Sequence, residues 1–440
     1  MKADSSTPIL SHSLLLPFVL ITSLFALWGF ANDITNPMVS AFKKVLELNN
    51  TQASWVQAAF YGGYFTMALP AAYVVRKYSY KTGIVVGLFL YAFGAVLFYP
   101  AAAYENYLFF LLALYILTFG LAFLETTANP FILSMGDERT ATQRLNLAQA
   151  FNPLGALTGL FVAQTFILSA LQSDDVDAQG NSTYEALTGA AKAAVRTADL
   201  EVIRNPYVIL GIFVALLMIV IAGVKMPEQK STATSSMKDS IKRIFKNKRF
   251  VGGVLAQLFY VGAQIMCWTY IYQYAENLEI DNRSAVNYAY AALILFLLGR
   301  FICTFLLRFI DSGKLLMFLG LGAIFFCLGT IFIEGLMGLY ALVLVSFCMS
   351  LMFPTIYGIA LHNLGEDAKP GSAFLVMAIV GGAFMPVLQG MILDWGGSGY
   401  NDVSVLGVPE VNISFVLPLL CFVVVTYYGF SSITRNSSKV

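Results

Sequence analysis

The sequence predicts an all-α integral membrane protein whose twelve transmembrane helices form two pseudo-symmetric six-helix bundles. Of its 440 residues, 58% are hydrophobic and only 12% are charged, whereas a soluble domain carries about 25% charged residues. The apolar residues gather in runs of about twenty, the length that a helix needs to cross a bilayer. A basic segment near the middle of the chain separates six such runs from six others.

The predicted spans follow one another through mostly short polar connections. They cover residues 13–42, 54–77, 82–102, 106–135, 145–171, 205–226, 248–275, 284–309, 313–334, 337–362, 371–395 and 413–433. The first is the longest, so it can include a short end outside the membrane. Because residues 1–12 are polar and the first run is long enough to span, we expect no cleavable signal peptide.

The distribution of basic residues predicts the orientation of the chain. With the N-terminus in the cytoplasm, 19 of the 26 Lys and Arg residues fall on the cytoplasmic side and 6 on the outer side. Cytoplasmic loops carry the excess of basic residues in membrane proteins. We therefore expect both termini in the cytoplasm.

Two connections are long. Residues 172–204 form a polar outer segment in which we expect a short amphipathic helix near 184–202. Residues 227–247 form a basic cytoplasmic linker, so the predicted domains are an N-terminal bundle of residues 1–226 and a C-terminal bundle of residues 248–440. The linker charges could bind anionic lipid head groups, although control of topology alone is the simpler explanation.

The two halves resemble each other. The fourth span contains Asn129-Pro130-Phe131, and the tenth contains Phe353-Pro354-Thr355. Basic loops also connect the second span to the third and the eighth to the ninth. These features favour a duplicated transporter of the major facilitator kind, with its site at the midplane between the halves.

A carboxylate lies inside the fourth span. A charged side chain at the bilayer centre costs at least about 2.5 kcal/mol and normally faces a cavity or a partner. Glu125 occupies such a position, and Asn129 follows one turn later on the same face, just before the helix-weakening Pro130. We interpret Glu125 as a proton-coupling and substrate-binding residue and Asn129 as a substrate ligand. The alternative is a structural carboxylate bonded to neighbouring amides.

The first span carries a second acid. Asn32, Asp33 and Asn36 lie within about one turn of one another, and Pro37 follows them. We interpret Asp33 as the second proton-coupling residue and the two asparagines as substrate ligands. The alternative for Asp33 is a solvated helix end near the outer surface.

Amides recur along the fifth span. Asn146, Gln149 and Asn152 are spaced by three residues and share one slowly drifting face. Amides in lipid need partners, and an amide can both donate to and accept from sugar hydroxyls. Sugar binding is favoured for Gln149 and Asn152, whereas bonding between helices is favoured for Asn146.

The seventh span alternates amides with aromatic rings along one face. Gln257, Tyr260, Gln264 and Trp268 form this stripe, which suits stacking on a sugar ring beside groups that bind hydroxyls. Gln264 and Trp268 are the stronger candidates. The remaining weaker candidates lie in the eighth and tenth spans: Asn287, Tyr288, Phe353 and Tyr357. Packing alone is the alternative for the aromatic residues.

One arginine lies within the eighth span. Arg300 either extends toward the membrane surface or pairs with an acid such as Asp311. We expect a gating or structural role for it.

Other classes of function are disfavoured. The net charge of +1 argues against a nucleic-acid partner. Two histidines are too few for a histidine-based metal site, and the cysteines make no C-x-x-C pair, so we expect no metal and no cofactor. No nucleophile–base pair indicates an enzyme, and the short tails disfavour a sensor. The five cysteines all fall in apolar segments: Cys267, Cys303, Cys327, Cys348 and Cys421.

At several of these segments the chain resembles the L-fucose:proton symporter family of the major facilitator superfamily. The resemblance runs from about Phe18 to Thr434. It is carried by Leu124–Phe131, Arg144–Asn152, Tyr260–Tyr270, Ala58–Phe65 and Ser79–Gly83. It implies an alternating-access symporter that imports fucose, glucose, galactose or a related sugar across a bacterial inner membrane. It also implies that Glu125 is the substrate-linked acid and that Gln149 and Asn152 belong to the sugar site.

The chain departs from the family pattern at two positions. The family's aspartate in the first span corresponds to Asn36, and the nearest acid is Asp33, one turn earlier. The family's tyrosine in the tenth span corresponds to Phe353. We expect a monomeric monosaccharide:proton symporter in the lipid bilayer, with sodium coupling or export of a drug or metabolite as alternatives.

Overall fold

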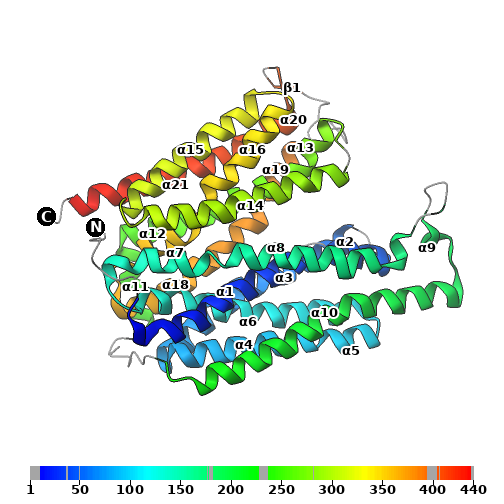
Figure 1. The fold of residues 1–440 in the computed structure, drawn as a ribbon, viewed down its shortest axis with the longest axis horizontal. Coiled ribbons are helices and arrows are strands. Elements are labelled where there is room, and N and C mark those ends of the chain that lie inside the picture. The colour runs from blue at the N-terminus through cyan, green and yellow to red at the C-terminus, as the bar shows by residue number, and fades with distance from the viewer. Residues whose placement is uncertain are drawn as a thin grey trace. The chain divides into compact units, whose positions relative to one another are not determined.

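The structure is a computed structural model, and it consists almost entirely of helices (Figure 1). It describes residues 10–35, 38–48, 50–175, 177, 182–226, 236–280, 282–393, 404–405 and 407–437. Within these residues, eleven helical segments are long and apolar enough to cross a membrane. A further helix, α3 (Asn50–Lys77), has 28 residues and corresponds to the second predicted span. The twelve-helix prediction agrees with this arrangement.

The chain divides into two compact units. Unit 1 contains Met1–Phe18, Asn129–Pro153 and Thr232–Val440, and unit 2 contains Val19–Ala128 and Leu154–Ser231. The end of the fourth span and the start of the fifth therefore group with the C-terminal part of the chain.

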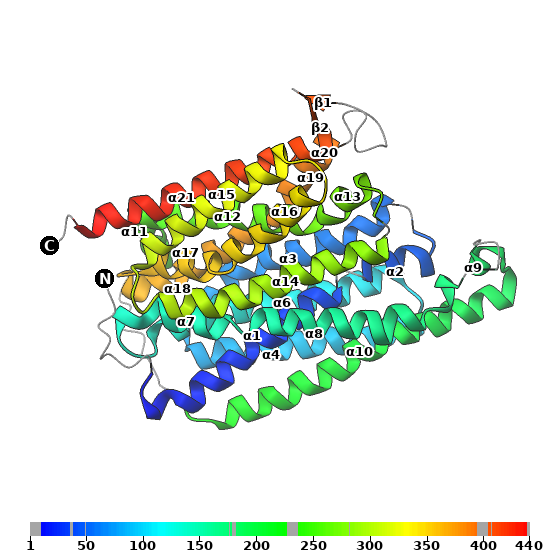
Figure 2. The same cartoon turned by 45° about the horizontal axis from the view of Figure 1, so that its top comes forward.

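The helices of the N-terminal part lie mainly in unit 2. They are α1 (Leu15–Thr35), α2 (Met38–Val45), α3, α4 (Tyr80–Val96), α5 (Phe98–Ala103), α6 (Tyr107–Ser134), α8 (Asn152–Val162), α9 (Thr183–Ala186) and α10 (Gly189–Gly223). Helices α4 and α10 lie side by side (Figures 1 and 2). Helix α4 packs closely on α6 because a side chain at Gly120 would overlap the backbone of Tyr91. Small residues allow such close approach between membrane helices.

Unit 1 contains the remaining helices and a short hairpin. The helices are α7 (Ala141–Gln149), α11 (Met237–Lys246), α12 (Lys248–Thr269), α13 (Ile271–Asn277), α14 (Asn282–Leu306), α15 (Ser312–Phe332), α16 (Leu336–Met349), α17 (Met352–Leu361), α18 (Ala368–Met377), α19 (Gly381–Leu393), α20 (Glu410–Ile413) and α21 (Val416–Ser437). Helices α14, α15, α16 and α21 run side by side.

The shorter elements complete the described chain. Strands β1 (Ser404–Val405) and β2 (Val408–Pro409) pair antiparallel, with Ser404 opposite Pro409. The short 3₁₀ helices are His12–Leu14, Glu138–Thr140, Leu168–Ala170, Gln172–Asp174, Gly365–Asp367 and Ala378–Val380. One π-helical turn covers Ala163–Ile167.

Polar side chains set the first residues of several helices. The Ser79 hydroxyl accepts a hydrogen bond from the Thr82 N–H and caps α4. Asn247 caps α12 in the same way, and the Asp311 carboxylate accepts from the Gly313 N–H and caps α15. Each cap satisfies a backbone donor that the helix itself leaves without a partner.

Two predicted boundaries were wrong. The expected short amphipathic helix near 184–202 is instead the first part of α10, which continues from Gly189 through Pro206 to Gly223. The fifth span begins at Ala141 rather than 145, because its first turn is polar yet still helical. The predicted linker contains the helix α11, which Ser236 caps through the Asp239 N–H.

Candidate functional site

Glu125 lies on α6 in unit 2 and only 6% of it is exposed. The side chains that follow it along α6, Thr126 and Asn129, are also buried. Helix α6 continues through Pro130 to Ser134, so this proline does not end the helix. The sequence prediction of a carboxylate inside an apolar helix therefore agrees with the position of Glu125.

A buried tyrosine of α3 lies in the same unit as this acid. Tyr64 is 2% exposed, and its hydroxyl oxygen accepts a hydrogen bond of 2.7 Å from the Trp28 Nε1–H of α1. Unit 2 thus contains a buried hydrogen bond between α1 and α3.

Asn32 and Asp33 are half-buried near the end of α1. The side-chain oxygen of Asn32 is buried and has no hydrogen-bond partner among the described residues. Buried amide oxygens are normally hydrogen-bonded, so a hydroxyl group of a bound molecule could satisfy this one. Asn36, the third polar residue predicted there, lies outside the described residues.

Unit 1 contains a hydrogen-bond chain around Gln149. The Gln149 Nε2 donates to the Asn129 Oδ1 at 2.7 Å. The Arg300 Nη1 of α14 donates to both the backbone oxygen and the Oε1 of Gln149 at 3.3 Å. All three side chains are at most 5% exposed. This chain joins α6, α7 and α14 through polar groups that could also bind sugar hydroxyls.

Aromatic rings extend the hydrogen-bond chain around Gln149 beyond Arg300. The Arg300 guanidinium lies 4.7 Å from the centre of the Phe296 ring, one turn earlier on α14. Phe296 packs edge to face on Trp268, whose Nε1 donates to the Ser346 Oγ at 3.1 Å. Trp268 is half-buried. A guanidinium held on an aromatic face keeps its N–H groups available for hydrogen bonds, because these groups point outward in the guanidinium plane.

Helix breaks lie beside these polar residues. The fifth span consists of α7, which ends at Gln149, and α8, which begins at Asn152 with Pro153 in its first turn. The tenth span is likewise divided between α16 and α17, with Phe353 just after the break. Discontinuous helices with exposed backbone groups mark the binding sites of many transporters. Asn152 is half-buried at such a break.

Further polar contacts join α7 to α14 and α17 within unit 1. The Asn146 Nδ2 donates to the Thr355 Oγ1 at 3.2 Å, and the Gln143 Nε2 donates to the Thr304 backbone oxygen at 3.3 Å. Gly358 of α17 lies against Thr142, since a Cβ there would be 2.7 Å from its Oγ1. These contacts agree with the bonding between helices that was favoured for Asn146.

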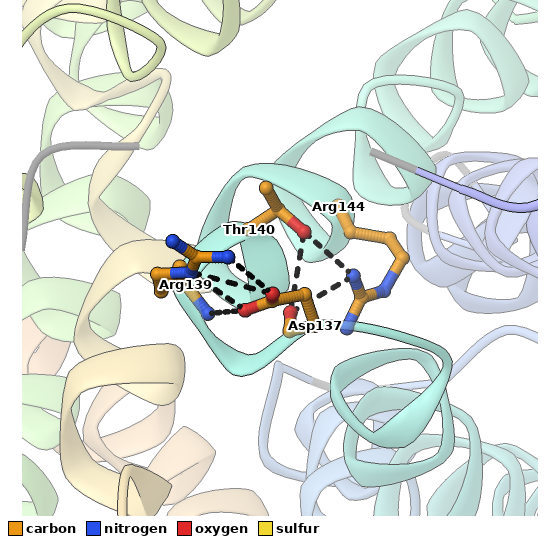
Figure 3. Close-up of polar contacts among 4 residues, drawn as sticks. All are labelled: Asp137, Arg139, Thr140 and Arg144. Atoms are coloured by element: carbon orange, nitrogen blue, oxygen red, sulfur yellow. Dashed lines mark hydrogen bonds and ion pairs between the residues drawn. The ribbon is translucent and has the colours of Figure 1, made fainter. Parts of the chain in front are cut away.

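A buried arginine holds the turn between α6 and α7. Arg144 donates to the backbone oxygens of Ile132 and Leu133 at 2.9 and 2.7 Å. It also donates to the Thr140 hydroxyl at 3.0 Å (Figure 3). The guanidinium therefore satisfies carbonyl groups at the end of α6 that the helix leaves without donors. Arg144 positions Gln149 indirectly, because it fixes the start of α7.

The same turn carries an exposed ion pair. The Arg139 Nη2 lies 2.9 Å from the Asp137 Oδ2, and Figure 3 shows the two side chains pointing toward each other. Hydrogen bonds from Arg139 lower the pKa of Asp137 to about 2. Both side chains are at least 36% exposed, so this pair contributes little to stability.

Other predicted residues lie in different surroundings. The Tyr260 hydroxyl donates to the Met349 backbone oxygen at 3.1 Å, and that of Tyr357 donates to the Ser372 oxygen at 3.5 Å. Phe353 packs against both of these rings. Gln257 is fully buried, and neither its amide nitrogen nor its amide oxygen has a hydrogen-bond partner among the described residues.

Gln264 is half-buried on α12, whereas Asn287 is exposed. Asn287 and Arg300 are thirteen residues apart on α14, which corresponds to about 20 Å along the helix axis. The structure therefore does not bring Asn287 to the Gln149 chain. Its neighbour Tyr288 packs against Tyr340.

Of the two alternatives for Arg300, extension toward the membrane surface does not occur, because only 3% of Arg300 is exposed. It contacts Gln149 and Phe296 instead, while Asp311 caps α15. Sequence reasoning also missed Trp28, Tyr64 and Phe296. The spacing of Phe296 and Arg300 by four residues was the only local signal for the last of these.

Comparison with known proteins agrees with this architecture. Residues 19–387 match the family model described as the Major Facilitator Superfamily. The chain is 54% identical to the L-fucose-proton symporter of Haemophilus influenzae over 96% of its length and 97% of that protein. It is 38% identical to the L-fucose-proton symporter of Escherichia coli over 95% of its length and 93% of that protein. It is also 32% identical to a glucose/galactose transporter of Brucella abortus over 93% of its length and 92% of that protein.

A solved structure shows the same fold. The crystal structure of the major facilitator transporter FucP in the outward conformation superimposes with a TM-score of 0.85 at 35% identity. The superposition covers 96% of this chain and 99% of that one.

Proposed function

The chain belongs to the Major Facilitator Superfamily, and we propose that it is a sugar:proton symporter that works by alternating access. The relatives that it matches along almost their whole length are transporters. The structural observation that supports the proposal most directly is the buried carboxylate of Glu125 on the helix that also supplies Asn129 to the Gln149 chain. One helix thereby connects an acid with groups suited to hydroxyl recognition.

L-fucose is the first substrate to test, because the relatives with 54% and 38% identity are named L-fucose-proton symporters. Asn129, Gln149 and Arg300 offer amide and guanidinium groups for its hydroxyls. Trp268 offers a ring for its apolar face. Phe353 places an apolar ring near Tyr260, which suits the methyl group of a 6-deoxy sugar better than a hydroxymethyl group.

Coupling to protons follows from the cost of burying charge. A carboxylate without water is disfavoured until it is protonated or meets a donor. We propose that Glu125, assisted by Asp33, takes a proton from the outer side. The sugar then binds, and the transporter changes to its inward-facing conformation while Glu125 is protonated and therefore neutral. Release of the sugar admits water, and the proton leaves Glu125.

The moving parts are proposed to be the bundles of residues 1–226 and 248–440, joined by the linker 227–247. The contacts of α7 with α14 and α17 would then hold the two bundles together on one side of the membrane. The excess of Lys and Arg indicates that this side and both termini are cytoplasmic. We propose a monomer in the bacterial inner membrane.

Transport by reconstituted protein tests the function. In proteoliposomes, a pH gradient that is acid outside should drive accumulation of L-fucose, and a sodium gradient at fixed pH should not. Sodium-driven accumulation would overturn proton coupling. Efflux of lipophilic cations that sugar does not affect would overturn sugar symport.

Replacing Glu125 by Gln tests its role. The variant should still exchange sugar across the membrane but lose accumulation driven by the pH gradient, because glutamine cannot release a proton. Glu105→Gln is the matched control, since Glu105 forms an ion pair with Arg196 away from Glu125 and is partly exposed. Gradient-driven accumulation in Glu125→Gln at the native rate would contradict the assignment.

A further inference from the structure

Helix α11 lies directly before the span that begins with α12, and the proposed transport cycle gives it no role. We propose that its outer face binds the phosphate head groups of anionic phospholipids at the cytoplasmic surface that the distribution of Lys and Arg predicts. The partner is therefore a lipid surface, and the proposal holds whichever substrate the protein transports.

One side of α11 is held against unit 1. The Arg243 guanidinium donates to both carboxylate oxygens of Asp367, at 2.9 and 2.8 Å. The side chains of Ser240 and Ile244 are buried. Helix α11 contacts α12 and α18, which belong to the same unit (Figures 1 and 2). The helix therefore has a defined inner face, and its remaining side chains form an outer face.

The outer face carries three lysines. Lys238, Lys242 and Lys246 are spaced by four residues, so they share one side of the helix, and all three are exposed. Within the described part of the chain, none of them has a hydrogen bond or an ion pair. Phe245 follows Lys238 by seven residues and lies beside this stripe, 47% exposed. Lysines beside an exposed aromatic ring are typical of helices that lie at a membrane surface.

Two simpler explanations do not account for this pattern. Control of topology depends on the number of basic residues near a span and does not require that they share a face. A helix face exposed only to water usually carries charges of both signs. The one acid in α11, Asp239, lies in the first turn, where its carboxylate accepts from the Ser236 hydroxyl at 2.8 Å. The stripe is therefore complementary to anionic head groups.

The position of α11 in the chain places it near those head groups. The segment Lys248–Asn277 is long and apolar enough to cross a membrane, so its first turn lies at the membrane surface. Only Asn247, which caps α12, separates this segment from α11. The attraction of a lysine to anionic lipid falls off within about 8 Å at physiological ionic strength. We therefore expect Lys242 and Lys246 to contribute most.

Hydrogen–deuterium exchange of the full-length protein in nanodiscs tests the proposal. Nanodiscs of phosphatidylcholine are compared with nanodiscs in which part of this lipid is replaced by phosphatidylglycerol. Bound head groups should slow amide exchange in residues 237–246 by at least about fivefold, the factor expected for one lysine at an anionic surface. High salt should remove the difference, because it screens the charges. Equal exchange in the two kinds of nanodisc, or a difference that persists at high salt, would overturn the proposal.

Combined substitutions of the stripe test the residues. The variant Lys238→Gln, Lys242→Gln, Lys246→Gln should exchange equally fast in both kinds of nanodisc. Arginine at the same three positions should keep the slowing, because it keeps the charges. Lysine, glutamine and arginine have similar helix propensities, so α11 should remain helical in both variants. Slowing that survives in the glutamine variant would contradict the assignment of these lysines.

A matched control removes three other lysines. Lys77, Lys225 and Lys314 are exposed and lie on the same predicted side of the membrane, outside α11. Their combined replacement by Gln should keep the slowing in residues 237–246, and its loss there would show that only the total charge matters.

Inorganic phosphate separates a lipid surface from a free anion. Added to phosphatidylcholine nanodiscs, it should not slow exchange in α11, because it lacks the high local density of head groups. Slowing as large as that caused by phosphatidylglycerol would overturn the lipid assignment. None of these measurements uses sugar transport, so failure of this proposal and failure of the proposed function are distinguishable.

Discussion

Gln149 contacts groups from two other helices. It donates to Asn129 of α6 and accepts from Arg300 of α14, and its backbone oxygen accepts from the same arginine. Each such bond contributes only about 1 kcal/mol net, but a partner left alone in a buried site costs more. Loss of one member therefore affects the other two.

We predict that Arg300→Lys weakens transport by raising the KM for sugar about tenfold, which corresponds to about 1.4 kcal/mol. A lysine cannot reproduce both the hydrogen bonds to Gln149 and the contact of the guanidinium with the Phe296 ring, because its ammonium is not planar. The measurement is initial uptake over a range of sugar concentrations. Arg308→Lys on the same segment is the control, since Arg308 is exposed. An unchanged KM in Arg300→Lys would contradict the prediction.

Among the secondary-structure elements, α7 is a short helix of unit 1 that contacts both α14 and α17. Arg144 holds its start through the carbonyl groups of α6, and Gln149 ends it beside a helix break. On the same helix, Gln143 contacts α14 and Asn146 contacts α17. The spacing of these amides by three residues turns one face of α7 toward both helices.

We predict that Gly358→Val separates α17 from α7. The new side chain would overlap Thr142, since even a Cβ lies 2.7 Å from its Oγ1, and such overpacking costs about 1–3 kcal/mol. Hydrogen–deuterium exchange should become faster in residues 141–149 and 352–361. Gly223→Val is the control, because nothing lies within 4 Å of a Cβ there. Native exchange rates in Gly358→Val would show that this contact does not hold the helices together.

For the whole molecule, sugar binding and stability are linked. A ligand that binds only the folded protein stabilises it by about 2.7 kcal/mol at one hundred times its Kd. We predict that L-fucose raises the Tm of the detergent-solubilised protein more than glucose, galactose or mannose does. The measurement is thermal unfolding followed by tryptophan fluorescence across these sugars. A larger shift with glucose or galactose would transfer the substrate assignment to hexoses.

The sequence alone determined the class of the molecule and the position of its acids along the chain. Hydropathy decides which segments cross a membrane, because each helix must satisfy its backbone groups internally. It therefore predicted twelve helices and placed Glu125 inside one of them. The same local reasoning explains why boundaries were less accurate. Polar turns at Ala141 and Gly189 remain helical although their hydropathy resembles that of loops.

The partners of these residues were decided only by the tertiary structure. The sequence placed Gln149 and Arg300 in different spans, and nothing in either span indicates that they meet. The Trp28–Tyr64 bond and the grouping of Asn129–Pro153 with the C-terminal part of the chain were equally unforeseen. Many amides and aromatic rings in this chain could pair in principle. Which of them do pair depends on how helices distant in sequence pack, and hydropathy and periodicity do not describe that packing.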